Sequence, residues 1–177
     1  MAHVPTKPNI PGIGSLFDYR PETAAPLRAL AQQLLRGPSP ISAADRELIA
    51  AYVSSRNGCR YCTRSHAAIA RRLGDPSVVD AVLADLDAAP ISAELCALLA
   101  IADAVRGAVA RVPDALVEAA RARGASDVAI HDAALIGAAF SMYNRYVDGL
   151  GADTPDEGDA SYVAAAERLR NGYIPRG

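Results

Sequence analysis

Long helix-forming stretches, separated by proline and glycine, are the feature that most constrains the fold of this chain. Alanine, the strongest helix former, is its commonest residue, whereas aromatic residues make up only 5%. Proline and glycine stand where helices are expected to end, as in residues 37–40 and 57–58 and at Pro90. We therefore expect an all-α fold.

The positions of these breaks place the individual helices. The first is expected at 21–36, and the second starts at Ser42, which forms a capping box with Asp45, and ends at residues 57–58. The others are expected at about 59–73, 76–88, 92–110, 113–123, 126–149 and 159–171. With 177 residues, the chain 1–177 has the size of a single domain. Residues 1–20 are rich in proline and glycine, and we expect an extended N-terminal arm that frays or lies across a neighbouring surface.

The charge balance argues against two classes of partner. The 18 basic and 20 acidic residues give a net charge of −2, whereas proteins that bind nucleic acids or membrane surfaces usually carry a basic excess or a basic face. No apolar run approaches the roughly 20 residues that span a bilayer, and residues 1–11 lack the pattern of a secretory signal. Three cysteines are too few for a secreted disulfide scaffold, so the expected compartment is the cytoplasm.

Two of these cysteines form a CxxC motif, Cys59-Arg-Tyr-Cys62, at the start of the expected 59–73 helix. With His66, Ile69 and Leu73 they follow the spacing of one helix face, so both thiols and the imidazole should face the protein. Their place in the first turn, at the positive end of the helix dipole, favours a thiolate. His66 lies one turn beyond Cys62, where it can accept a thiol proton directly or through one water.

Glu47 adds a carboxylate to this group. It lies in a stripe of small residues on the second helix, and the short break at 57–58 lets the second and third helices pack as a hairpin. Glu47 can then reach His66 or a thiol, and a partly buried carboxylate with a raised pKa would relay protons near neutral pH. Ser65 falls among the polar residues on the other faces of the 59–73 helix.

The remaining thiol and imidazole groups have ordinary structural explanations. Cys96 has the expected character of a small buried hydrophobe. His131 is expected to be a hydrogen-bonded core histidine, and His3 to be inert in the N-terminal arm.

Two kinds of chemistry fit Cys59, Cys62 and His66. In the redox interpretation, one thiolate attacks a peroxide oxygen or a disulfide, and the other thiol closes an intramolecular disulfide. In the metal interpretation, the three residues bind zinc with Cys96 or Glu47 as the fourth ligand. The chain has no second CxxC and no histidine pair, so the redox interpretation is favoured.

These residues closely resemble the AhpD-like alkylhydroperoxidases of the carboxymuconolactone decarboxylase superfamily. The match runs from Asp45-Arg-Glu-Leu-Ile to Asn57-Gly-Cys-Arg-Tyr-Cys-Thr-Arg-Ser-His66, and the Glu-x11-Cys-x2-Cys-x3-His spacing has no gap. Pro11-Gly-Ile, Arg20-Pro-Glu22 and residues 140–150, with Asn144-Arg145, resemble the peroxidase-related branch. The resemblance therefore covers most of the chain.

The resemblance implies an AhpD-like helical fold with a CxxC-bearing helical hairpin, and a homo-oligomer, commonly a trimer or hexamer. It assigns Cys62 as the peroxidatic thiol, Cys59 as the resolving thiol, and His66 with Glu47 as a proton relay. The decarboxylases of the superfamily generally lack the CxxC. The apolar character of residues 128–150 favours oligomerisation independently.

The spacer between the cysteines departs from the family pattern. The best-known members carry a histidine there, whereas this chain has Arg60 and Tyr61. A phenol with a pKa of about 10 cannot shuttle protons near neutral pH. Tyr61 is therefore expected to order the site or shape access to it.

The sequence thus predicts a thiol-dependent peroxidase that reduces small hydroperoxides. No motif for flavin, nicotinamide, haem or ATP is present, so no cofactor is expected and the electrons would come from a lipoamide- or thioredoxin-like dithiol. Three alternatives stay open: a general thiol–disulfide oxidoreductase, a non-enzymatic zinc-stabilised helical protein, and an oligomeric binding protein with a vestigial CxxC.

Overall fold

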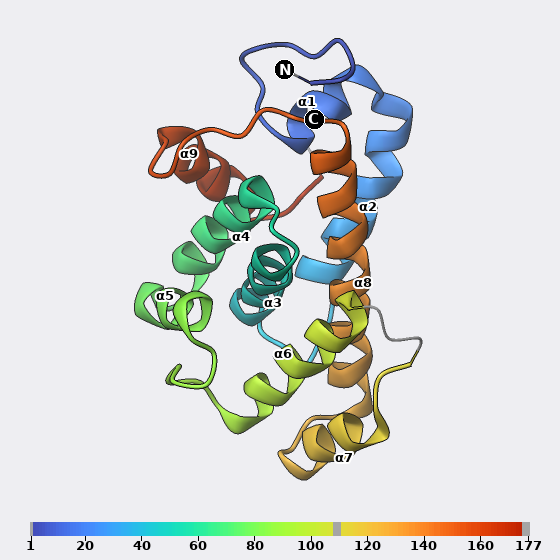
Figure 1. The fold of residues 1–177 in the computed structure, drawn as a ribbon, viewed down its shortest axis with the longest axis vertical. Coiled ribbons are helices and arrows are strands. Elements are labelled where there is room, and N and C mark those ends of the chain that lie inside the picture. Colours follow the sequence, from blue (N-terminus) through green and yellow to red (C-terminus); the bar gives the residue numbers. More distant parts are fainter. Residues whose placement is uncertain (1, 108–110, 175–177) are drawn as a thin grey trace.

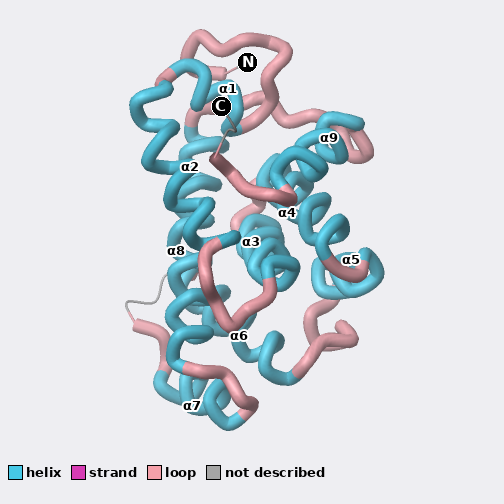
Figure 2. The backbone as a smooth tube through the Cα atoms, turned by 180° about the vertical axis from the view of Figure 1, so that it is seen from behind, coloured by secondary structure: helices cyan, strands magenta, loops and turns pink. Residues whose placement is uncertain are grey.

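The computed structural model describes residues 2–107 and 111–174, and this part of the chain is helical, with loops and no strand (Figure 2). Its helices are α1 (Ile13–Tyr19), α2 (Pro21–Arg36), α3 (Ala43–Arg56), α4 (Arg60–Leu73), α5 (Pro76–Ala84), α6 (Ala93–Arg106), α7 (Asp114–Ala122), α8 (Asp127–Gly149) and α9 (Ala160–Leu169). The expected all-α class is confirmed. No helix in the described ranges is long and apolar enough to cross a membrane.

Most helices begin where their capping residues predict. The hydroxyl oxygens of Ser42, Ser92 and Ser126 each accept a hydrogen bond from the backbone N–H three residues on, which satisfies a free donor of the first turn. The expected 92–110 helix ends at Arg106, and residues 108–110 lie outside the described part of the chain. The expected 76–88 helix is shorter and ends at Ala84.

Helix α3 lies near the centre of the fold and is seen almost end-on in Figure 1, with α4, α6 and α8 around it. Residues 46–54 are all buried. Neighbouring helices therefore cover this part of α3 on every side. Glu47 is therefore 0% exposed rather than partly buried.

Helix α8 extends along the long axis of the molecule and packs closely against α6 (Figure 1). At their crossing, a Cβ on Gly137 would lie 2.8 Å from the carbonyl oxygen of Ala102. Only glycine allows the two backbones to approach so closely. Phe140, one turn further along α8, is fully buried in the core.

Part of the segment that we expected to be an extended arm is helical. Residues 13–19 form α1, because Leu16 and Phe17 bury their side chains and tertiary contacts stabilise a helix too short to form alone. The residues before it lie across the end of α8, where His3 N–H donates to the Leu150 carbonyl at 2.8 Å. Gly12 has a φ of +56° and packs against the Tyr61 ring, a contact that leaves no room for a side chain.

Candidate active site

The hairpin of α3 and α4 carries the sequence-predicted site residues. Gly58, with a φ of +77°, ends α3 in the left-handed conformation that glycine favours, and Cys59 caps the next helix. The Asn57 amide at the turn donates to Asn144 Oδ1 at 2.9 Å and to Ser141 Oγ at 3.3 Å, so α8 holds the tip of the hairpin. The predicted CxxC-bearing hairpin is confirmed.

The two cysteines form a close, buried pair at the start of α4. Cys59 is 0% exposed and Cys62 is 3% exposed, and both pack against Leu16 and Val147. Both are free thiols. Two thiols three residues apart in the first turn can form a disulfide after a small adjustment of the backbone.

The resting Cys62 thiol is harder to ionise than we expected from its helix position. Hydrogen bonding with Cys59 and burial raise the pKa of Cys62 well above its ordinary value of 9.0, although a hydrogen bond with Asn144 acts in the opposite direction. The hydrogen bond with Cys59 and the burial of the sulfur both favour the neutral thiol, in spite of its place in the first turn of α4. Cys62 therefore needs a base to become a nucleophile.

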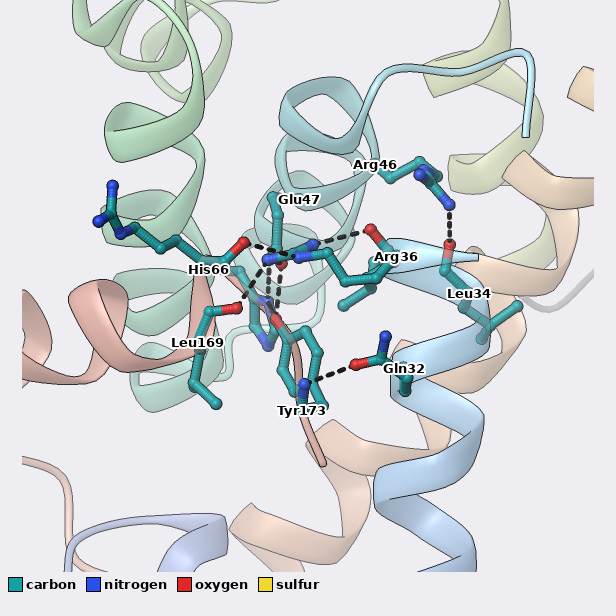
Figure 3. Close-up of polar contacts among 10 residues, drawn as sticks. Gln32, Leu34, Arg36, Arg46, Glu47, His66, Leu169 and Tyr173 are labelled. Carbon is teal, nitrogen blue, oxygen red and sulfur yellow. Dashed lines mark hydrogen bonds and ion pairs between the residues drawn. The ribbon is translucent and has the colours of Figure 1, made fainter. Parts of the chain in front are cut away.

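Glu47 lies at the centre of a buried charge network (Figure 3). Its Oε2 atom is 2.6 Å from His66 Nδ1, and its Oε1 atom is 2.6 Å from the Arg36 guanidinium. The Tyr173 hydroxyl donates to the same Oε1 at 2.7 Å. The expected approach of Glu47 to His66 is present, but two further donors share the carboxylate.

These partners reverse the expected ionisation of Glu47. Burial alone would raise the pKa of the carboxyl, but the pKa is lowered because His66, Arg36 and Tyr173 stabilise the charged form. The prediction of a raised pKa is wrong for this reason. An ionised Glu47 can orient and charge-balance His66, but it does not hold a proton near neutral pH.

Arg36 and Tyr173 are parts of the network that the sequence did not reveal. Arg36 ends α2 and also donates to the carbonyls of Leu169 and Arg170, so it fixes the chain that follows α9. The Tyr173 N–H donates to Gln32 Oε1 at 2.7 Å, which positions the tyrosine ring beside His66 (Figure 3).

His66 is oriented from both sides of its ring. Its edge-to-face contact with Phe140 has a centroid distance of 4.6 Å, and Tyr173 stacks at 6.3 Å. Because Nδ1 faces the Glu47 carboxylate, it carries the ring proton in the neutral tautomer. Nε2 is then the unprotonated nitrogen that can accept a proton.

A cavity of about 110 Å³ brings Cys62 and His66 together. Phe17, Tyr61 and Phe140 contribute aromatic walls to it. Cys59 and Glu47 do not line it, so the cavity meets one thiol and one base, with their partners behind them. Tyr61 forms part of the wall beside Cys62, and its role in shaping access stays a prediction.

Ser65 also lines this cavity and is 8% exposed. Its expected place on a polar outer face is wrong, because α9 packs against that side of α4. Its hydroxyl is buried beside the Tyr61 phenol, but no group among the described residues meets it with full hydrogen-bond geometry.

The other candidates lie elsewhere. Cys96 is half-buried on α6 and does not line the cavity. His131 is exposed beside Asp132, so its expected place in the core is wrong, because it lies on the outward face of α8. Within the described ranges, no three His, Cys, Asp or Glu side chains are grouped to hold a metal ion. The zinc alternative therefore has no geometric support there.

Comparison with known proteins gives a family and several solved structures. The model of the carboxymuconolactone decarboxylase family matches residues 21–104, which contain all four predicted site residues. An uncharacterised peroxidase-related protein from Silicibacter sp. is 30% identical, with a TM-score of 0.77 over 86% of this chain and 78% of that one.

Two further structures are similar. An uncharacterised peroxidase-related protein with an alkylhydroperoxidase AhpD core, from Ralstonia eutropha, is 28% identical, with a TM-score of 0.78 over 94% of this chain and 83% of that one. A protein of unknown function from Agrobacterium tumefaciens, put forward as an antioxidant-defence AhpD protein, is 25% identical, with a TM-score of 0.70 over 86% and 100% of the two chains. No curated protein matches the sequence.

Proposed function

This chain belongs to the AhpD-like carboxymuconolactone decarboxylase superfamily, and from that premise we propose that it is a thiol-dependent peroxidase that reduces hydroperoxides. The observation that carries the proposal is the cavity shared by Cys62 and His66, with Cys59 paired behind the thiol and Glu47 behind the imidazole. This arrangement offers a substrate one nucleophile and one base.

The first step is attack of Cys62 on the terminal oxygen of a hydroperoxide. His66 Nε2 accepts the thiol proton as the sulfur attacks, which compensates for the raised pKa of Cys62. The O–O bond breaks, and the departing alkoxide takes the proton back from His66 to become an alcohol. Cys62 is left as a sulfenic acid, so the sulfur is oxidised by two electrons and the peroxide is reduced by two.

The second step is closure of a disulfide by Cys59. Its sulfur attacks Cys62 Sγ, the S–O bond breaks, and the leaving hydroxide combines with the Cys59 proton to form water. The burial of both sulfurs limits access by other oxidants and thiols before the ring closes. This protection favours the disulfide over further oxidation of the sulfenic acid.

Glu47 and Arg36 act as positioning residues. The ionised carboxylate fixes the Nδ1–H tautomer of His66 and stabilises the imidazolium that forms during attack. The Arg36 guanidinium offsets the carboxylate charge in a site that excludes water. The family resemblance implies a proton relay of two residues. In the proposed mechanism only His66 accepts the proton, and the ionised Glu47 positions it.

A dithiol of the lipoamide or thioredoxin type would regenerate the enzyme. One donor thiolate attacks Cys62 Sγ, which lines the cavity, and Cys59 leaves as the thiol. The second donor thiol then resolves the mixed disulfide and releases oxidised donor. A cavity of about 110 Å³ suits a small dithiol such as lipoamide better than a folded thioredoxin-like protein, and for the same reason it disfavours folded protein disulfides as substrates, which argues against a general thiol–disulfide oxidoreductase.

The test is consumption of cumene hydroperoxide by metal-stripped protein with excess dithiol reductant. We expect turnover in the wild type, its loss in Cys62→Ser, and its retention in Cys96→Ser, which removes the thiol outside the site. Turnover that is absent from the wild type, or unchanged in Cys62→Ser, would refute the proposal.

A further inference from the structure

Two arginines flank the mouth of the reactive cavity. Arg28 comes from α2 and Arg168 from the last turn of α9, and both line the cavity that contains Cys62. Both also line a neighbouring groove beside the chain that follows α9. They therefore lie where the buried cavity meets the more open groove, between solvent and the thiol.

Neither guanidinium has an acidic partner among the described residues. The lining of the cavity includes no carboxylate, and Glu167, which lines the groove, is paired with Arg72 and Arg170. Arg28 instead lies over the Phe17 ring, 4.7 Å from its centroid. The cavity mouth therefore carries two positive charges that nothing described neutralises.

The two charges act on each other. Partial burial and the charge of Arg168 both lower the pKa of Arg28. Arg168 also counteracts part of the rise that burial causes in the pKa of Tyr61, the neighbour of Cys62. Like charges this close disfavour the empty site, and an anion bound between them would relieve the repulsion.

The interior of the cavity suits a different part of a ligand. Its wall is formed by aliphatic and aromatic side chains, among them Leu27, Ile69 and Phe140. The buried Ser65 hydroxyl in the cavity lining lies one turn of α4 beyond Tyr61 and can donate to a peroxide or alkoxide oxygen.

From this arrangement we propose that the site is specific for hydroperoxides that carry a carboxylate on an apolar body. The carboxylate binds Arg28 and Arg168 at the mouth, the apolar body fills the cavity, and the peroxide oxygens meet Cys62 and Ser65. This inference rests on the proposed peroxidase function and names its substrate class. The reaction is that given above, with a hydroxy acid and the Cys59–Cys62 disulfide as products.

The experiment compares para-carboxycumene hydroperoxide with cumene hydroperoxide, which have the same reacting group and differ in one carboxylate. Each is mixed with fully reduced protein without any dithiol reductant, and loss of thiols gives the rate constant of oxidation. Leaving out the reductant matters because a dithiol that itself carries a carboxylate could bind the two arginines and change the measured rates. The variants are Arg28→Gln and Arg168→Gln, and Arg123→Gln, an exposed arginine after α7, is the control.

The readout is the ratio of the two rate constants, because any effect of lost positive charge on Cys62 itself cancels in it. We expect the wild type to favour the carboxylated substrate, and each Gln variant to lower the ratio by about tenfold, the worth of one charge-assisted hydrogen bond. Added salt should lower the ratio in the wild type, since the mouth is open to solvent. Arg123→Gln should leave the ratio unchanged.

Two different results would count against the two proposals. If both hydroperoxides oxidise the wild-type thiols at similar rates and neither Gln variant changes the ratio, the carboxylate site is wrong and the peroxidase stands. If neither hydroperoxide oxidises the thiols, the peroxidase itself is wrong.

Discussion

Replacing Glu47 by glutamine tests the buried charge network on which the proposed site depends. The substitution keeps the shape of the side chain and removes its charge. All three partners of Glu47, namely His66, Arg36 and Tyr173, present a donor to the carboxylate. The amide nitrogen of glutamine must therefore either face the donors Arg36 and Tyr173 or face His66 Nδ1, which would then have to give up its ring proton.

The structure gives the size of the expected effect. Glu47 is fully buried and the Arg36 side chain is only 9% exposed, so the variant leaves a largely buried guanidinium without its counter-charge. Breaking such a pair from one side costs about 3–5 kcal/mol. With a urea m-value of about 2 kcal/mol/M for a chain of this size, the midpoint of unfolding should fall by about 2 M.

The assay is urea unfolding of both proteins at several pH values. Because the pKa of Glu47 is lowered in the folded state, its contribution is present above the ordinary value of 4.5 and is lost as the pH falls through the folded-state pKa. The difference between wild type and Glu47→Gln should therefore shrink in acid. This sign is opposite to the one that a raised pKa would give.

Glu118→Gln is the matched control, because Glu118 is exposed on α7 and has no ion-pair partner in the described part of the chain. We expect it to change stability by no more than about 0.5 kcal/mol. If Glu47→Gln also changes the free energy of unfolding by no more than about 0.5 kcal/mol at neutral pH, the charge network is refuted.

Three further predictions follow from other parts of the molecule. Tyr173→Phe removes a hydrogen bond to a buried carboxylate and should destabilise the fold by about 1.5–3 kcal/mol; an effect no larger than that of the exposed Tyr19→Phe would contradict this. Because the pKa of Cys62 is raised well above its ordinary value of 9.0, the thiolate absorbance that Cys62→Ser removes should be absent at neutral pH, and a Cys62 thiolate signal near neutral pH would oppose this. Light scattering should give a multiple of the 18.4 kDa monomer, and a lower mass for Leu135→Glu, since Val128, Leu135 and Met142 form an exposed apolar stripe on α8; a monomeric wild type would disprove it.

Local signals in the sequence placed most helices. Ser42 and its capping partner fixed the start of α3, and residues 57–58 fixed its end, because capping and left-handed glycine act within a few residues. Helix α1 was missed because its stability comes from burying Leu16 and Phe17 against distant parts of the chain. The local sequence of the seven residues after Gly12 does not show which distant residues they will pack against.

That the four candidate residues lie close together could be predicted, because Cys59, Cys62 and His66 have the spacing of one helix face at the start of α4, and Glu47 lies on the helix that pairs with it. The roles of Arg36 and Tyr173 could not be predicted. Tyr173 is 126 residues from Glu47, and no sequence pattern relates either residue to the carboxylate. The direction in which the pKa of Glu47 shifts was predicted wrongly for the same reason. It depends on the number of donors around the carboxylate, which only the tertiary structure supplies.

The most direct test of the central claim is a single oxidation of the reduced protein. One equivalent of cumene hydroperoxide is added without a reductant, thiols are counted, and peptides are mapped by mass spectrometry. We predict that two of the three thiols are lost and that Cys59 and Cys62 are joined, whereas Cys59→Ser stops at a Cys62 sulfenic acid that dimedone traps. An unchanged thiol count, or equal thiol loss in Cys62→Ser, would contradict the account.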